Sequence, residues 1–212
     1  MPGLPSIDVA ELQKSLPSPL PDEIIELISY SAGFDISPNR SLRFTGVPGF
    51  SFASLLPYSV ALLGDGAGNF WAADINPLNG AWGPIFFVNH DPPVIVLQEV
   101  NVGSFISQLV APNETSAEGG FDEVLARAVN RIWRADPWLV SADKARSCLD
   151  ANLSAFVDQL PTNYCIADLR AKEIGSGFAW GRAGADAKVR RAGTALVFAI
   201  EQKARTVADP HE

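Results

Sequence analysis

Residues 59–75, SVALLGDGAGNFWAADI, place two apolar segments on either side of a glycine-rich turn, and this stretch decides the fold. The glycines of the turn can adopt backbone angles that a Cβ atom would penalise, so the chain is predicted to reverse there and form a hairpin. Turn residues recur at 76–80 and at 91–93, and each turn is followed by another apolar run. Turns at this spacing predict an antiparallel sheet over residues 59–98.

Helices are predicted on both sides of this sheet. A proline and two acidic residues mark the start of a helix over residues 22–32, and Gly33 ends it. After the sheet, Ser104 is predicted to cap a second helix that ends before Pro112. Residues 37–57 are rich in Pro, Gly and Ser, which indicates irregular structure with room for one edge strand.

The chain is divided by residues 112–120, a polar stretch that ends in a glycine pair and is predicted to be a linker or exposed loop. Residues 1–118 carry 12 acidic and three basic residues, a net charge of −9, whereas residues 119–212 carry 12 acidic and 13 basic residues, a net charge of +1. We therefore predict an α+β domain in the first part, with a central antiparallel β-sheet flanked by helices, and a C-terminal helical extension in the second.

Helical periodicity characterises the second part. Apolar residues recur at spacings of three and four in residues 121–132, 149–160 and 189–200, and Ser141 is predicted to cap the second of these helices. A basic cluster in the third is interpreted as a solvated helix face. It consists of Lys188, Arg190 and Arg191. Packing on the sheet, a homodimer surface and a partner contact all stay open as roles for these helices.

The whole chain is acidic, with 16 Lys and Arg against 24 Asp and Glu in 212 residues and a formal net charge of −8. An acidic surface repels phosphate backbones, which argues against direct binding of nucleic acid. The apolar runs are far shorter than the roughly 20 residues of a membrane-spanning helix, and residues 1–11 lack the pattern of a secretory signal. We expect a cytoplasmic protein in which Cys148 and Cys165 are free thiols.

No cofactor or metal site is predicted. Two His and two Cys cannot build a four-ligand structural zinc site unless all four converge. The glycine-rich turn lacks the Lys-Ser/Thr ending of a phosphate-binding loop, and Asp65, Asn69 and Asp74 do not have the spacing of a calcium loop. His90 with Asp91 or Asp65 is a candidate acid–base pair, but an ordinary histidine at a strand end is favoured.

Four segments in order resemble the SUKH superfamily: the helix start LPDE at 20–23, GDGAGNFWAAD at 64–74, GPIFFVNHD at 83–91 and GSFISQL at 103–109. This superfamily includes the Smi/Knr-type yeast cell-wall assembly regulator and many bacterial immunity proteins. The resemblance covers about half of the chain, roughly residues 20–110. It implies an α+β fold with a central antiparallel sheet, no catalytic residues and a role in binding another protein. In bacterial members that protein is usually a toxin, often a nuclease.

The leading hypothesis is a non-catalytic immunity protein that neutralises a cognate toxin or effector with a cationic surface. Carboxylates on such an inhibitor would steer association and oppose the cationic cleft of a nuclease. Trp82 is the tryptophan selected as partly exposed in a turn and as an anchor for the partner, because aromatic residues are enriched at binding hot spots. Packing of Trp82 over the edge of the sheet stays open as the alternative. The acidic candidates for partner contact are Asp22, Glu23, Glu26, Asp35, Asp65 and Asp91.

Two alternatives stay open. One is a regulatory scaffold module of the kind that the yeast relative represents, which binds cellular partners without a toxin. A gene position directly after a toxin gene separates an immunity protein from such a module. The other alternative is a hydrolase that uses His90 with Asp91 or Asp65.

Overall fold

The structure is a computed structural model that describes residues 1–111, 121–135, 138–148, 150–182, 184 and 187–202. The described residues form six helices and eleven strands in three antiparallel sheets, which confirms the predicted α+β class. The predicted linker at residues 112–120 lies outside the described residues.

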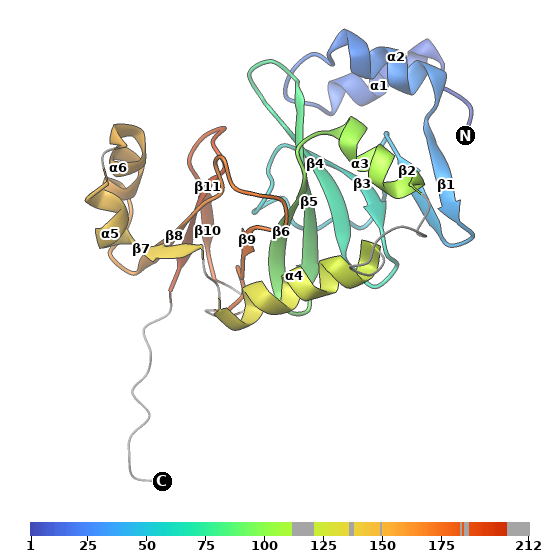
Figure 1. Cartoon of the computed structure of the whole chain (residues 1–212). Coiled ribbons are helices and arrows are strands. Elements are labelled where there is room, and N and C mark those ends of the chain that lie inside the picture. Colours follow the sequence, from blue (N-terminus) through green and yellow to red (C-terminus); the bar gives the residue numbers. More distant parts are fainter. Residues whose placement is uncertain (112–120, 136–137, 149, 183, 185–186, 203–212) are drawn as a thin grey trace.

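The predicted antiparallel sheet is the centre of the fold, and we call it the central sheet (Figure 1). Its strand order is β3-β4-β5-β6-β9, and every neighbouring pair is antiparallel. In the β3–β4 turn, Gly66 and Gly68 have φ angles of +79° and +91°, as the hairpin prediction requires. The strands are β3 (Ser59–Gly64), β4 (Phe70–Ile75), β5 (Trp82–His90), β6 (Pro93–Glu99) and β9 (Gly177–Phe178).

Helices and a small hairpin cover one face of the central sheet. The predicted helix at residues 22–32 is present as α2, and the one strand allowed for in residues 37–57 is present as β2, whereas α1 and β1 occur where no element was predicted. The proline-rich start of the chain contains α1, and the hairpin β1–β2 begins at Gly33, directly after α2. The elements are α1 (Ser6–Lys14), α2 (Asp22–Tyr30), β1 (Gly33–Ser37), β2 (Arg40–Arg43), α3 (Val102–Val110) and α4 (Phe121–Ala135).

The cap of α3 differs from the prediction. Asn101, not Ser104, is the N-cap residue, and its Oδ1 accepts a hydrogen bond of 2.8 Å from the backbone N–H of Ser104. Asn is as good an N-cap as Ser, so a helix start that contains both residues can begin at the earlier one. The predicted end before Pro112 is confirmed, since α3 stops at Val110.

The largest difference from the prediction is a second, four-stranded sheet. Residues 189–200, predicted as a helix, form two of its strands, so the description of residues 119–212 as a helical extension is wrong. The order of this second sheet is β10-β11-β8-β7, and all its pairs are antiparallel. Its strands are β7 (Leu139–Ser141), β8 (Tyr164–Asp168), β10 (Val189–Arg191) and β11 (Val197–Glu201).

Burial on both faces explains the misassignment. In β11, Phe198 and Ile200 belong to one core cluster, whereas Val197 and Ala199 belong to another. A strand with two buried faces has a continuous apolar sequence, and periodicity alone does not separate such a run from a buried helix. Gly193, with φ of +55°, lies in the turn that joins β10 to β11.

Two further helices follow α4 in the second part. Ser141 is a helix cap as predicted, because its hydroxyl accepts from Lys144 N, but the helix that it caps is the short α5 (Ala142–Arg146). The periodic segment that begins at residue 149 contains α6 (Ala151–Asp158), and α6 has its own cap in Asp150. The predicted single helix is therefore two helices with separate caps.

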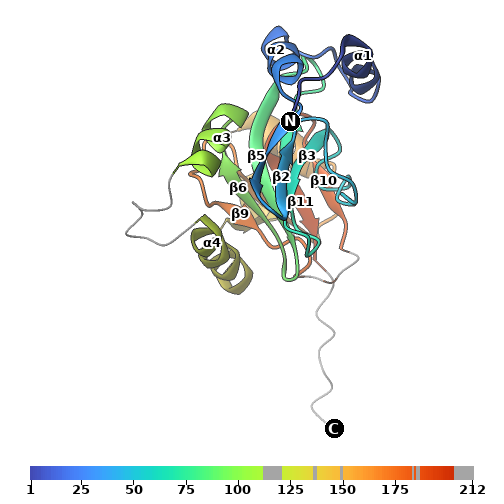
Figure 2. The same cartoon turned by 90° about the vertical axis from the view of Figure 1, so that its right-hand side faces the viewer.

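The elements form four layers. α1 to α4 and the β1–β2 hairpin lie on one face of the central sheet, where Trp71 and Phe87 are in the core. The other face, with Phe86 and Val88, packs against Phe198 of the second sheet. α5 and α6 cover the far face of the second sheet and are seen at the left in Figure 1. In Figure 2, turned by 90°, α1 and α2 lie above the strands of the central sheet and α3 and α4 lie at their left.

A buried ion pair joins the two sheets. The guanidinium of Arg191 on β10 binds both carboxylate oxygens of Asp74 on β4, at 2.6 and 2.7 Å. Both side chains are 7% exposed. Arg191 also donates to the carbonyls of Thr194 and Ala195 and lies over the ring of Phe198. The interpretation of Arg191 as part of a solvated helix face is therefore wrong.

Candidate functional site

A pocket of about 480 Å³ opens between α4 and the end of the central sheet where the β3–β4 and β5–β6 turns lie. We call it the acidic pocket. Three aspartates, one arginine and two asparagines supply its polar groups, and aromatic and aliphatic side chains supply the rest of its wall. It is lined by Arg40, Asp65, Trp71, Phe87, Asn89, Asp91, Pro92, Asp122, Leu125, Ala126, Val129 and Asn130.

Asp65 is held by the glycine-rich turn in which it lies. Its Oδ1 accepts hydrogen bonds from the backbone N–H groups of Ala67 and Asn69, at 2.7 and 3.1 Å. Its Oδ2 accepts from Asn69 Nδ2 at 2.6 Å. Aspartate commonly binds the backbone of its own turn in this way, so the same residue shapes the turn and presents a charge at the pocket.

Asn69 connects this turn to the next one. Its Oδ1 accepts from the backbone N–H of His90 at 2.9 Å and lies 3.0 Å from His90 Nδ1. Asp91 follows directly and is exposed. The β5–β6 turn is closed by a hydrogen bond of 2.8 Å from Asn89 Nδ2 to the carbonyl of Pro92. The two turns are thus fixed side by side, with Asp65 and Asp91 both at the pocket.

Arg40 and Asp122 complete the charged lining, and the sequence analysis did not select either residue. Arg40 Nη1 lies 3.0 and 3.2 Å from the carboxylate oxygens of Asp122 on α4. The guanidinium also lies 4.9 Å from the ring centroid of Trp71. Asp122 lies in the first turn of α4, where an acid is favourable to the helix dipole, and no local pattern connects it to a residue 82 positions earlier.

The balance of charge in the acidic pocket is negative, with three carboxylates against one guanidinium. Trp71 and Phe87 are buried beneath it. A cation is attracted both by carboxylates and by the face of an aromatic ring, and Arg40 already makes both kinds of contact. The pocket therefore suits a cationic group better than an anionic one.

Shifted pKa values occur elsewhere. Hydrogen bonds from Arg170 lower the pKa of Asp168. The ion pairs of Arg170 with Asp168 and Asp150 raise the pKa of Arg170. The backbone hydrogen bond from Leu153 is the largest cause that lowers the pKa of Asp150, and a hydrogen bond from the side chain of Arg170 lowers it further. Burial raises the pKa of Glu99. None of these residues lines the acidic pocket, and each is explained by its place in the fold.

Of the seven residues selected from the sequence, the structure brings Asp65 and Asp91 together. Asp35 is exposed on β1, where its carboxylate accepts from the hydroxyl of Ser41 at 2.6 Å. The remaining three acids lie on the exposed face of α2. They are Asp22, Glu23 and Glu26.

Trp82 is not partly exposed as predicted. It is 8% exposed and starts β5, where it pairs with Ile75 of β4. Its ring belongs to the core that also contains Leu20 and Ile24, next to the start of α2. Gly80 and Gly83 lie on either side of Trp82 and suggested a turn. The strand β5 nevertheless begins at Trp82 and includes Gly83. A contact between Trp82 and a partner would require this end of the sheet to open.

His90 has an amide neighbour rather than a carboxylate. Its ring lies against Asn69, and Asp65 binds the opposite end of the same amide. In the part of the chain that the structure describes, no group of three or more His, Cys, Asp or Glu is arranged to hold a metal ion. Cys148 and Cys165 are free cysteines. None of the described helices is long and apolar enough to cross a membrane.

Comparisons of the chain with protein-family models, with curated proteins and with solved structures found no match.

Proposed function

We propose that the protein is a non-catalytic immunity protein of the SUKH type, which acts in the cytoplasm by binding and neutralising a cognate bacterial toxin or effector. The resemblance of the first part of the chain motivates the class of protein. The observation that carries the proposal is the meeting of Asp65 and Asp91 at a pocket with aromatic residues in its wall.

The partner surface that fits this pocket is cationic. Asp65, Asp91 and Asp122 are on three different elements, so a partner that binds all of them must reach into the space between the two turns and α4. A lysine or arginine side chain fits such a site, since its charge meets carboxylates and its stem meets apolar walls. Toxins that cut nucleic acid carry such side chains in their substrate clefts, and occupation of that cleft would block the substrate.

Recognition by this pocket requires little rearrangement. The turn of Asp65 is held by three hydrogen bonds to its own carboxylate, and Asn69 ties it to the neighbouring turn. A site that is already ordered loses less conformational entropy when the partner binds.

Co-expression tests the proposal directly. The gene beside this one, if it encodes a toxin, is expressed with and without the immunity protein in a sensitive host, and the two purified proteins are mixed on a sizing column. Rescue of growth together with a stable complex is the expected result. Absence of both would overturn the proposal, and binding to cellular proteins without any toxin gene nearby would instead favour the regulatory scaffold.

A further inference from the structure

The outer face of α2 is acidic and partly apolar. Asp22, Glu23 and Glu26 are exposed on it, and no described residue forms an ion pair with any of them. The same helix exposes Ile25 and Tyr30, and Tyr30 is 87% exposed. We call this surface the α2 face.

A groove of opposite charge lies along α4. This hollow of about 510 Å³ runs between the outer side of the helix and the loop that precedes β9. We call it the α4 groove. It is apolar with two arginines, and Val124 and Ile174 in its wall are 43% and 50% exposed. Its lining residues are Val124, Arg127, Ala128, Arg131, Ile174 and Gly175.

The groove is ordered before anything binds. Arg131 Nη2 donates to the carbonyl of Gly175 at 3.1 Å, which fixes the loop against the helix, and its guanidinium lies 5.1 Å from the ring centroid of Trp138. Within the described ranges, neither Arg127 nor Arg131 forms an ion pair with a carboxylate.

The charge around the groove is positive. Three exposed basic residues lie on α4 or in the loops near its C-terminal half, in addition to the two arginines of the wall, and three exposed acids lie on α4 or in these loops. The bases are Arg134, Lys172 and Arg182, and the acids are Glu123, Glu173 and Asp122, of which Asp122 pairs with Arg40. The α4 groove thus combines an apolar wall with positive charge. The α2 face combines exposed apolar side chains with negative charge, so the two surfaces are complementary.

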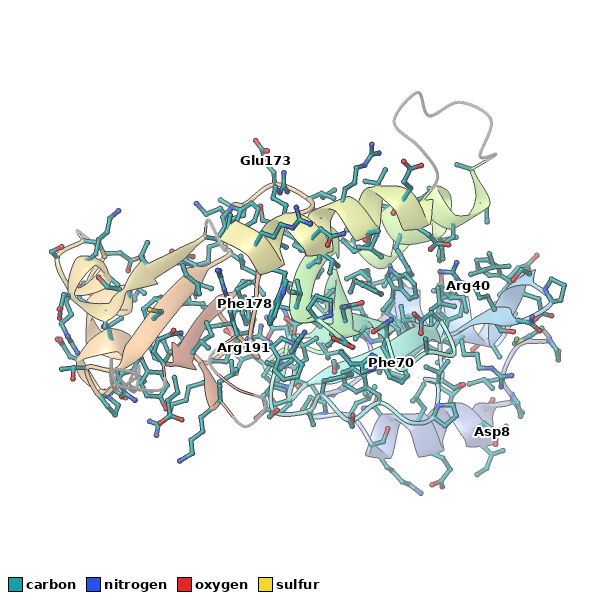
Figure 3. All side chains as sticks on the ribbon, turned by 90° about the horizontal axis from the view of Figure 1, so that it is seen from below. Asp8, Arg40, Phe70, Glu173, Phe178 and Arg191 are labelled. Carbon is teal, nitrogen blue, oxygen red and sulfur yellow. The ribbon has the colours of Figure 1, made fainter. Side chains whose placement is uncertain are left out.

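The two surfaces are far apart in one molecule. The segment before α2 contacts the β4–β5 turn, because Ser18 Oγ donates to the carbonyl of Pro77, whereas α4 lies near the opposite end of β4. In Figure 1 and Figure 2 α2 and α4 are at opposite ends of the molecule, and in Figure 3 Asp8 of α1 and Glu173 lie on opposite sides. One chain cannot bring its own two surfaces together.

We propose that the α2 face of one copy docks in the α4 groove of a second copy. An amphipathic helix in a hydrophobic groove is a recurrent mode of recognition, and here the acids of the helix meet the arginines of the groove. If a twofold axis relates the copies, each α2 fills the groove of the other and the contact forms twice. The acidic pocket is not part of this interface, so the proposal is independent of the proposed function.

Charge reversal with heterotypic rescue tests this contact. The wild-type protein, Glu23→Arg with Glu26→Arg, and Arg127→Glu with Arg131→Glu are compared by sedimentation velocity at low salt, without any toxin. The wild type is expected to dimerise with increasing concentration. The dissociation constant of the dimer is expected to be at least about tenfold higher for each double variant. An equimolar mixture of the two variants is expected to dimerise again, because each then supplies the charge that the other lacks.

A matched control reverses two exposed bases outside the groove, Lys144→Glu with Lys188→Glu, and is expected to dimerise as the wild type does. Arg127→Glu alone serves as a milder variant, because Arg131 has structural contacts. A wild type that stays monomeric at the highest soluble concentration would overturn the proposal. Dimers that survive the groove variants, or a mixture that fails to associate, would also overturn it.

Discussion

Arg191 and Asp74 are 117 residues apart in the sequence and form a bidentate ion pair at the junction of the two sheets. The pair connects β10 with β4, and each side chain is 7% exposed. A buried charge is stable only with a partner and with its remaining polar atoms satisfied, and Arg191 meets this condition through two carbonyls. The pair therefore ties the position of the second sheet to the central one.

The first prediction concerns this pair. Arg191→Met leaves the carboxylate of Asp74 buried without its partner, so the free energy of unfolding in urea should fall by about 3–5 kcal/mol. The double variant Asp74→Asn with Arg191→Met removes both charges and should lose clearly less than Arg191→Met alone. Equal losses in the two variants would contradict the account of a paired buried charge.

Part of the fold could be predicted because it depends on local chemistry. The β3–β4 hairpin follows from glycines at the turn, and α4 follows from apolar spacing with acids at its start and arginines toward its end. β11 could not be predicted in this way, because its two faces are buried in different core clusters and its sequence carries no alternation. β10 is only three residues long, too short for a pattern of its own. Arg191 was placed on a solvated face because its partner, Asp74, lies 117 residues away in the sequence.

The acidic pocket was predictable in one respect. In a meander of four strands, the first and third turns lie at the same end of the sheet. The strand order alone therefore predicts that Asp65 and Asp91 lie near each other. The contribution of Arg40 and Asp122 depends on how β2 and α4 pack on that sheet. Such contacts between distant elements leave no trace in the spacing of residues along the chain.

A second prediction follows from the ion pairs of Arg170. Because the pKa of Asp168 is lower in the folded protein than its ordinary value of 3.8, the ion pair stabilises the fold above that pH. The stabilisation is lost as the pH falls through the folded pKa. In urea titrations from pH 6 to pH 3, the wild type should lose stability more steeply than Arg170→Met. Lys188→Met, which changes an exposed base elsewhere, should keep the wild-type slope.

A third prediction has the opposite sign and concerns Glu99. This side chain is 9% exposed, and burial raises its pKa above the ordinary value of 4.5. The folded state therefore favours the protonated form, and stability falls as the pH rises from that value through the folded pKa. Glu99→Gln should be more stable than the wild type at pH 7, and the difference should vanish below pH 4. The exposed Glu173→Gln is the control, and a gain of equal size there would refute the explanation by burial.

A fourth prediction separates the acidic pocket from general acidity. Asp91 is exposed, and none of the ion pairs among the described residues includes it, so Asp91→Lys should leave the fold intact. In stopped-flow measurements with the adjacent toxin, this variant should associate on the order of tenfold more slowly at low salt, because a charge that steers the partner has been reversed. High salt should shrink the difference. Asp8→Lys changes the net charge equally from α1, at the far end of the molecule, and should associate nearly as fast as the wild type. Equal slowing in both variants would mean that net charge, and not the pocket, attracts the partner.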